Sequence, residues 1–388
     1  MSSGFNAFQY EIYLGGVGGE TPELPMTYEA MRERAREVLP AEAYGYVAGS
    51  ASSESTEAAN RRALDRWRLR PRMLRDVSER DLSVELFGRT LPAPVLLAPI
   101  GVQGILHEEA EVATARGAAT LGVPTVLSTV SSYTIEDVAE AAGDTPNWFQ
   151  LYWPTEDAIT DSLVQRAADA GYDAVVVTLD TRMLAWRPRD IEQAYLPFLH
   201  GKGLANYRSD PAFTAGIDAD AEDPETATIM RWAAVFGDPT QTWERLQALV
   251  ARSPLPVLVK GIQHPEDARL AIDAGVAGLV VSNHGGRQVD GAMGALEALP
   301  EVVDVAGDEV PVLFDSGVRT GADVAVALAL GARAVLLGRP FAFGLAVAGA
   351  DGVRHVLRCL LADLELTMAL SGVTTCAELD REMLVREA

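Results

Sequence analysis

The stretch Ala277-Gly278-Leu279-Val280-Val281-Ser282-Asn283-His284-Gly285-Gly286-Arg287-Gln288 carries the strongest structural signal in this chain of 388 residues. Its first five residues are small or apolar, which predicts a fully buried strand. The polar residues that follow mark the end of packing, and they offer His284 as a candidate base and Arg287 as a candidate anion binder. In a β/α barrel, catalysis takes place at this carboxyl end of the strands. Taken alone, the motif would favour a helix start with a solvent-exposed His and Arg.

Short apolar runs alternate with helical stretches through most of the chain after residue 92. Apolar strands without alternation are typical of a parallel sheet covered by helices. Eight such units fit closure better than an open sheet, so we predict an α/β fold, a (β/α)8 TIM barrel. The predicted strands cover residues 95–98, 125–127, 148–151, 174–178, 257–259, 278–281, 312–314 and 334–337. Helices are predicted between them, for example at residues 108–120, 156–170, 265–274 and 321–330.

A single domain over residues 1–388 is expected, with the barrel at residues 92–345. Residues 1–91 are predicted to form an N-terminal extension and helices, and residues 346–388 to form C-terminal helices. Residues 1–25 show no clear period and are expected to lie on the surface. The remaining N-terminal predictions are helices near residues 27–39, 42–47 and 54–66, and an edge or plug strand at residues 82–87.

The repeating pattern breaks once, over residues 190–243. This segment contains Pro, Gly, scattered aromatic residues and an acidic patch at residues 218–225. A connection of this length is typical of a functional lid or of a disordered loop. Because it follows the fourth predicted strand, we expect a long lid on the catalytic face.

Composition argues against several classes of partner. The formal net charge of −23 disfavours nucleic acid and anionic membrane surfaces. The N-terminus lacks the features of a signal peptide, and no apolar run approaches the ~18 residues of a membrane span. The two cysteines lack metal-ligand spacing and fit a reducing compartment. We therefore expect a cytoplasmic protein with no metal site and no nucleic-acid or membrane partner.

Seven of the eight predicted strands end in a hydroxyl, amide or ionisable side chain. Only the first, which ends in Ala98-Pro99-Ile100-Gly101, does not. The other ends are Ser128-Thr129, Gln150-Leu151-Tyr152, Thr178-Leu179-Asp180-Thr181, Lys260-Gly261, Ser282 to Gln288, Asp315-Ser316-Gly317-Val318-Arg319 and Gly338-Arg339-Pro340. A barrel with a purely structural role would have no reason for this arrangement.

The loops after the last two strands predict a phosphate site. Gly317 and Arg319 run into a predicted helix, and Gly338 and Arg339 follow the last strand. Glycines, free backbone N–H groups, arginines and a helix start bind phosphate well, and barrels commonly place a ligand phosphate here. Ordinary tight turns would explain the glycines but not both arginines.

Lys260 has two functional interpretations. Lysine occurs only at positions 202 and 260, so a lysine at the end of an apolar strand is unusual in this chain. It could form a Schiff base, as in an aldolase acting on a phosphorylated sugar, or place a positive charge beside a cofactor ring. The non-catalytic alternatives are a surface lysine and a barrel that only binds a phosphate ligand.

Two further pairs suggest acid–base chemistry on a carboxylate. Asp180, at the end of the fourth strand, could orient His284 and stabilise its protonated form. Arg187 and Arg287 could jointly hold a carboxylate, with a tyrosine hydroxyl sharing the contact. For each residue taken singly, a structural role is as good an explanation as a catalytic one. A structural role does not explain the whole set.

The segment from Ser282 to Gln288 resembles the signature of the FMN-dependent α-hydroxy acid oxidising family. The resemblance extends from about residue 27 to residue 385. The supporting motifs are Phe149-Gln150-Leu151-Tyr152, Thr178-Leu179-Asp180-Thr181, Leu258-Val259-Lys260-Gly261, Asp315-Ser316-Gly317-Val318-Arg319 and Leu337-Gly338-Arg339-Pro340.

The resemblance implies roles for individual residues. His284 would remove the substrate hydroxyl proton, with Asp180 supporting it, while the α-hydrogen passes to the flavin. Arg187, Arg287 and Tyr46 would hold the substrate carboxylate, and Tyr152 would lie near its hydroxyl. Lys260 would stabilise the reduced flavin ring. The implied FMN-binding residues are Pro99, Ile100, Gly101, Ser128, Gln150, Thr178, Lys260, Ser282, Asp315, Ser316, Gly317, Arg319, Gly338 and Arg339.

Within this family the chain resembles the lactate 2-monooxygenases most closely. The segments Tyr10-Glu11-Ile12-Tyr13, Leu24-Pro25-Met26, Trp186-Arg187-Pro188-Arg189-Asp190 and Leu196-Pro197-Phe198-Leu199 carry this resemblance, together with Gly101. It implies a small L-2-hydroxy acid and O2 as substrates and a homo-oligomer, a tetramer or octamer. A peroxide-releasing (S)-2-hydroxy acid oxidase and a mandelate-type enzyme are the alternatives.

Overall fold

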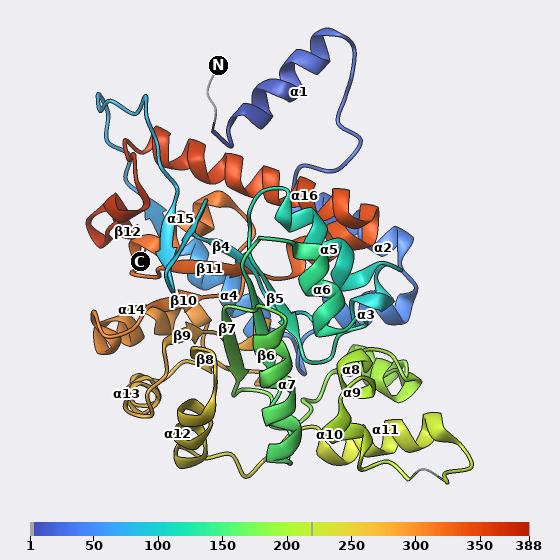
Figure 1. Cartoon of the computed structure of the whole chain (residues 1–388). Coiled ribbons are helices and arrows are strands. Elements are labelled where there is room, and N and C mark those ends of the chain that lie inside the picture. Colours follow the sequence, from blue (N-terminus) through green and yellow to red (C-terminus); the bar gives the residue numbers. More distant parts are fainter. Residues whose placement is uncertain (1–3, 219, 388) are drawn as a thin grey trace.

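Eight parallel strands close into a barrel in the computed structural model, which describes residues 4–218 and 220–387 (Figure 1). Each strand pairs with the next along the chain, and the last pairs with the first. The strands are β4 (Val95–Leu97), β5 (Thr125–Ser128), β6 (Asn147–Leu151), β7 (Ala174–Thr178), β8 (Val257–Ile262), β9 (Gly278–Val281), β10 (Val312–Phe314) and β11 (Ala334–Leu337). The predicted TIM barrel is confirmed, and the largest boundary error is β8, which continues past residue 259.

Every barrel strand is followed by a helix on the outside. These are α5 (Ala110–Ala119), α6 (Ile135–Ala142), α7 (Asp157–Asp169), α12 (Trp243–Arg252), α13 (Pro265–Asp273), α14 (Ala295–Ala306), α15 (Gly321–Ala329) and α16 (Arg339–Leu370). Capping boxes begin α6, where Thr134 pairs with Asp137, and α15, where Thr320 pairs with Asp323. Such caps satisfy backbone N–H groups that the helix itself leaves unpaired.

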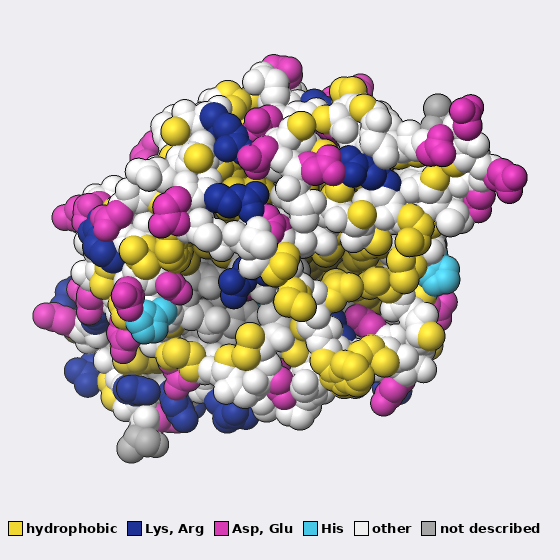
Figure 2. Space-filling model, turned by 90° about the horizontal axis from the view of Figure 1, so that it is seen from below, with side chains coloured by type: hydrophobic (Ala, Val, Ile, Leu, Met, Phe, Trp, Pro, Cys, Tyr) yellow, Lys and Arg dark blue, Asp and Glu magenta, His cyan; other side chains and the backbone are white. Residues whose placement is uncertain are grey.

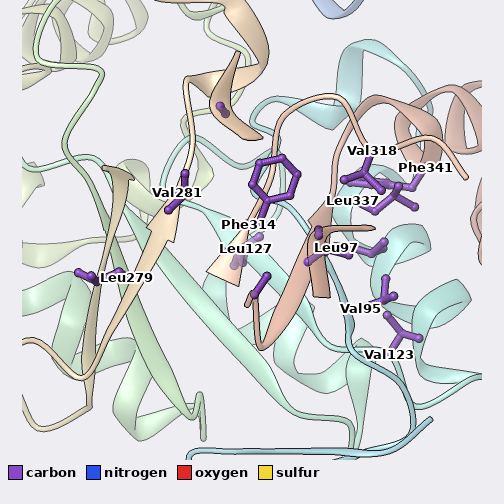
Figure 3. Packing of buried hydrophobic residues seen from close by; sticks show 14 of the residues in the cluster. Val95, Leu97, Val123, Leu127, Leu279, Val281, Phe314, Val318, Leu337 and Phe341 are labelled. Atoms are coloured by element: carbon purple, nitrogen blue, oxygen red, sulfur yellow. The ribbon is translucent and has the colours of Figure 1, made fainter. Parts of the chain in front are cut away.

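Alternate residues of each strand pack on opposite sides of the barrel wall. Outward-facing residues such as Leu97, Leu127, Val281 and Phe314 join the helices in the large core, which also includes Phe341 of α16 (Figure 3). Inward-facing residues form a second core to which every strand contributes, through Leu96, Val126, Trp148, Val176, Leu258, Val280, Leu313 and Leu336. The barrel interior is therefore a packed layer rather than a pore.

A hairpin plugs the amino end of the barrel. It consists of β2 (Val84–Leu86) and β3 (Arg89–Leu91), paired antiparallel. Val84, Leu86 and Leu91 belong to the interior core. The plug strand predicted at residues 82–87 is thus present, and it leaves the carboxyl end of the barrel as the open face.

The N-terminal helices lie against the barrel and α16. They are α1 (Ala7–Val17), α2 (Tyr28–Val38), α3 (Ala41–Ala48) and α4 (Ser55–Asp65). The last three match the predicted helices, but α1 was not foreseen. Its apolar residues lie on several faces, so no helical period stands out in the sequence. Phe8 of α1 packs edge-on against His355 of α16.

The predicted C-terminal helices at residues 346–388 are present only as far as residue 370. Helix α16 begins at Arg339, directly after the last strand, and is kinked at Ala348 and Gly349. After it, the chain forms the 3₁₀ turns η4 (Cys376–Glu378) and η5 (Arg381–Met383) and then strand β12 (Leu384–Arg386). β12 pairs antiparallel with β1 (Trp67–Leu69), which ties the C-terminal segment to the N-terminal one.

Residues 190–218 and 220–243 are organised rather than irregular, and the segment 190–243 is called the lid below. They hold short helical pieces: the end of α8 (Pro188–Glu192), then η2 (Pro197–His200), α9 (Ala205–Arg208), α10 (Pro211–Thr214) and α11 (Pro224–Val235). Proline opens four of these five pieces, where its missing N–H costs nothing. Across residues 4–218 and 220–387, no helix combines the length and apolar character needed to cross a bilayer.

Candidate active site

A polar layer lies directly above the apolar layer inside the barrel. Because side chains alternate along a strand, the residue two positions after each inward apolar residue also points inward. These residues are Ala98, Ser128, Gln150, Thr178, Lys260, Ser282, Asp315 and Gly338. All seven that carry a side chain are buried. All eight were predicted cofactor contacts or their immediate neighbours, so strand periodicity accounts for half of that set.

Neighbouring members of the polar layer are hydrogen-bonded. Ser128 Oγ donates to Gln150 Oε1 at 2.9 Å, and Gln150 Nε2 donates to Thr178 Oγ1 at 2.9 Å. Lys260 Nζ donates to Ser282 Oγ at 2.8 Å and lies 3.1 Å from Asp315 Oδ2. Burial works to lower the pKa of Lys260, but the charges of Asp315 and Asp180 outweigh it and raise that pKa. The lysine is therefore a fixed cation, which disfavours the Schiff-base interpretation because that chemistry needs a neutral amine.

His284 is held rigidly above this layer, in η3 (His284–Gly286). Its backbone is left-handed, with φ of 58°, and its N–H donates to Ser282 Oγ at 3.0 Å. The next residue, Gly285, donates its N–H to Ser316 Oγ at 3.0 Å. Asn283 exchanges two side-chain hydrogen bonds with Asn60 of α4, at 2.7 and 2.9 Å. The loop is thus fixed from both sides, and a left-handed histidine is the kind of strained geometry found at functional sites.

Asp180 determines which nitrogen of His284 is free to accept a proton. Its Oδ1 lies 2.8 Å from His284 Nδ1, and Thr181 Oγ1 donates to the same oxygen at 3.0 Å. Burial lowers the pKa of His284, and the attraction of Asp180 only partly opposes this. Burial acts to raise the pKa of Asp180, but the charge and hydrogen bond of His284 leave it lower than usual. A neutral imidazole that donates from Nδ1 to Asp180 keeps Nε2 free to accept a proton.

Two arginines and a tyrosine lie beside His284. Arg187 Nε donates to the Arg287 carbonyl at 3.1 Å, and the Arg287 guanidinium lies over the Tyr46 ring at 5.2 Å. Burial, together with the charges of Arg187 and Arg339, lowers the pKa of Arg287 to about 9. Arg287 therefore remains charged near neutral pH in a place with excess positive charge. Such a place favours an anion.

The two tyrosines keep their protons. Burial raises the pKa of Tyr46 and of Tyr152 above the ordinary value of a phenol. Both hydroxyls can therefore donate hydrogen bonds to a carboxylate or hydroxyl oxygen. Both rings line the same cavity as His284 and the arginines.

The predicted phosphate loops line the same cavity. Gly317 has φ of 102°, and Arg319 lies over the Tyr28 ring at 4.2 Å. A side chain at Gly338 would meet no atom within 4 Å, so open space adjoins its backbone. Arg339 is more engaged than expected, since it donates to the carbonyls of Val47, Gly49 and Gly285.

One cavity joins His284, the two arginines, the two tyrosines and the phosphate loops, and it reaches the polar layer at Ala98, Lys260, Asp315 and Gly338. It is lined by the strand-end loops, by α3 and α4, and by Phe198 and Phe236 of the lid. Figure 2 views the molecule from below the orientation of Figure 1, and hydrophobic side chains gather there beside a hollow that contains a Lys or Arg side chain. Exposed large hydrophobic residues among the described residues of the loop after β7 and of the lid are Met183, Leu184, Trp186, Ile191, Leu199 and Met230.

A family model for FMN-dependent dehydrogenases matches residues 35–386. The chain belongs to this family. The FMN-dependent α-hydroxy acid dehydrogenase qulF of Penicillium citrinum is 45% identical over 98% of this chain and 96% of its own length. The L-lactate oxidase of Lysinibacillus sphaericus is 42% identical over 98% of both chains. A crystal structure of mandelate oxidase with (S)-4-hydroxymandelic acid superimposes with a TM-score of 0.84, at 39% identity over 94% of this chain and 100% of that one.

The cofactor of this FMN-dependent dehydrogenase is FMN, and its reaction is the oxidation of an α-hydroxy acid. The donor set fits that cofactor. The polar layer offers hydroxyls, an amide and the Lys260 cation on one side, and the small residues Ala98 and Gly338 leave room on the other. When bound, FMN accepts the two electrons that leave the substrate.

Several residues of the site had no role assigned from the sequence. Thr181 contacts both Asp180 Oδ1 and His284 Nδ1, although the sequence marked it only as part of the fourth strand end. Gln288 donates to the Asp180 carbonyl at 2.8 Å and accepts from Arg187 Nη2 at 2.8 Å. Asn60 lies far away in sequence, on a helix with no motif that marks it.

Proposed function

We propose that this enzyme is an L-lactate 2-monooxygenase, which converts L-lactate and O2 into acetate, CO2 and water. Oxidation of lactate yields pyruvate and reduces O2 to hydrogen peroxide. Peroxide then decarboxylates pyruvate to acetate, CO2 and water if the two remain together. The balance requires one O2 per lactate and no free peroxide.

In this proposal His284 removes the substrate hydroxyl proton at Nε2. Asp180, at 2.8 Å from Nδ1, stabilises the imidazolium that forms. Arg187, Arg287 and Tyr46 hold the substrate carboxylate, and Tyr152 binds the hydroxyl oxygen. These residues position the substrate and accept its hydroxyl proton, whereas the cofactor accepts the electrons.

FMN is proposed to lie along the polar layer. Its ring would meet Pro99, Ile100, Gly101, Ser128, Gln150 and Thr178 on one side, with Lys260 and Ser282 supplying the positive charge and hydroxyl. Asp315 and Ser316 would face the ribityl chain. The phosphate would be bound by Gly317, Arg319, Gly338 and Arg339. Because the Arg339 guanidinium already donates to the carbonyls of Val47 and Gly49, the backbone N–H groups of these loops would supply most of the hydrogen bonds to the phosphate.

The observation that favours monooxygenation is the packing of the lid over the substrate end of the cavity. Phe198 and Phe236 of the lid pack against Trp232 with tilted rings, and the ring centroids are 4.8 Å apart in each pair. Phe236 also contacts the Tyr152 ring at 5.3 Å, and Phe198 contacts the Tyr46 ring at 6.4 Å. An aromatic cover on both substrate tyrosines would retain pyruvate and peroxide long enough to react.

Product analysis tests this proposal. Under aerobic turnover of L-lactate we expect acetate and CO2 in equal amounts, one O2 consumed per lactate, and little pyruvate or peroxide. Stoichiometric pyruvate and peroxide would instead assign a simple oxidase. (S)-Mandelate serves as the comparison substrate, and a higher kcat/KM for it than for L-lactate would favour a mandelate-type enzyme.

The pH profile tests the proposed role of His284. Because its pKa lies below the ordinary 6.5, the neutral base should prevail at pH 7, and kcat/KM should fall only as pH drops through that lowered pKa. Asp180→Asn removes the carboxylate that raises the His284 pKa, so the inflection should move to lower pH. The same change should slow lactate oxidation by about one to two orders of magnitude, since the imidazolium loses its counter-charge. An unmoved inflection would contradict the pairing.

A further inference from the structure

Glu111 is a buried carboxylate that the proposed chemistry does not use. It lies in the first turn of α5 with 2% of its surface exposed. Its Oε1 accepts from the Gln103 backbone N–H at 2.9 Å, and its Oε2 accepts from the Ser132 backbone N–H at 3.1 Å. Gln103 belongs to the loop after β4, and Ser132 to the loop after β5. One carboxylate therefore joins two strand-end loops.

These two loops form one wall of the cavity. Ile100 and Gly101 of the first loop and Val130 of the second line it. Val102 N–H donates to the Val130 carbonyl at 2.7 Å, and a Cβ added at Gly101 would lie 2.5 Å from Val130 Cγ2. The two loops are in close contact at this point. A shift of either loop therefore moves the residues that face the cavity.

The first loop is also bent in a way that needs support. Val102 is buried with a left-handed backbone, φ of 55°, which is unfavourable for a β-branched residue. Gln103 reinforces the bend, because its Nε2 donates to the Ile100 carbonyl at 3.1 Å and its Oε1 accepts from Thr114 Oγ1 at 2.6 Å. Glu111 contributes the hydrogen bond that anchors this bend to the neighbouring loop.

The lid rests on the same two loops. A Cβ added at Gly203 of the lid would lie 2.9 Å from Val102 Cβ. Ala205 N–H donates to the Ser131 carbonyl at 3.1 Å, and the buried Asn206 Nδ2 donates to the Thr129 carbonyl at 3.1 Å. The lid therefore packs on the same two loops that Glu111 joins.

We propose that Glu111 is a positioning residue that locks the loops after β4 and β5 into a single wall, so that the closed lid retains pyruvate and peroxide. This inference rests on the proposed monooxygenase function. It assigns Glu111 to the fate of oxygen and not to the oxidation of lactate, since the carboxylate contacts neither His284 nor the arginine pair. Loosening the wall would let the products escape before they react.

The test is the product ratio of Glu111→Gln holoenzyme at pH 8. Burial raises the pKa of Glu111 to about 7, so the wild-type carboxylate is ionised at pH 8 and can accept from both loops. A glutamine amide keeps the shape but sets an NH2 group against one of the two N–H donors. We expect acetate formed per O2 consumed to fall about fivefold or more, with matching release of pyruvate and peroxide. The anaerobic rate of flavin reduction by L-lactate should stay at the wild-type value.

Three further proteins show whether a change in the product ratio is specific to the Glu111 carboxylate. Glu109→Gln makes the same change two residues away, where the carboxylate pairs with Arg116 on the surface, and it should leave the ratio unaltered. Glu111→Asp keeps the charge but is too short to reach both loops, so it should give an intermediate ratio. Wild-type enzyme is the reference, and peroxide release by it would refute the monooxygenase itself.

If wild-type makes acetate and Glu111→Gln retains the same ratio, the positioning role is overturned while the monooxygenase stands. Parallel losses of flavin reduction and acetate would equally overturn it, because they would mark a general structural defect. If Glu111→Gln does not yield folded holoenzyme, Glu111→Asp decides by the same ratio. Failure of both variants to retain FMN would assign the carboxylate to folding alone and end the proposal.

Discussion

Replacing His284 with alanine should lower the anaerobic rate of flavin reduction by L-lactate about a thousandfold or more, within the range that a general base contributes. Among the residues that the structure describes, His284 is the one histidine that lines the cavity, and its Nδ1 is paired with Asp180, which leaves Nε2 as the proton acceptor. Removing it leaves the hydroxyl proton without an acceptor, while the arginines and the polar layer remain. FMN content and the affinity for a carboxylate inhibitor should therefore change little.

His264→Ala is the matched control for that variant. His264 accepts a backbone hydrogen bond from Glu266 and caps the outer helix α13, away from the cavity lining. We expect its flavin reduction to match that of the wild type. A His284→Ala enzyme with full FMN content and near-normal reduction would show that another group takes the proton.

The barrel was predictable from the sequence because its strands are uniformly apolar and its helices end in glycine. The positions of β7 and of β9–β11 were predicted from their composition alone. These strands are buried on both faces, so each appears in the sequence as an uninterrupted apolar run. The path of the lid was not predictable. Its short helices, such as α9 and α10, depend on contacts with the barrel loops and have too few residues for a periodic signal.

Site residues were predictable where a strand delivers them and unpredictable where a distant segment completes them. The pair His284 and Asp180 follows from two strand ends. The Asn60–Asn283 pair and the Glu111 bridge join residues whose contact depends on how α4 and α5 pack on the barrel. Arg339 shows the same limit, because its bonds to Val47 and Gly49 depend on the path of α3.

Replacing Arg287 with methionine should raise the KM for L-lactate and the Kd of a carboxylate inhibitor by about two to three orders of magnitude, as expected when one member of a buried charge pair is removed. The guanidinium groups of Arg287 and Arg187 repel each other, and this repulsion contributes to the lowered pKa of Arg287. A bound carboxylate relieves the repulsion, so it gains affinity from both arginines. Without Arg287, one cation remains and most of that gain disappears.

Two controls separate substrate binding from support of the fold. Arg287 Nη1 also donates to the carbonyls of Tyr46 and Gly49, at 2.7 and 2.6 Å, so the variant loosens α3. Arg287→Lys keeps the charge and loses the planar donor pair, and it should give an intermediate KM. Arg182→Met removes an exposed arginine from the loop after β7 and should behave as wild type. Unchanged inhibitor affinity in Arg287→Met, with FMN retained, would mean that Arg187 and Tyr46 hold the carboxylate alone.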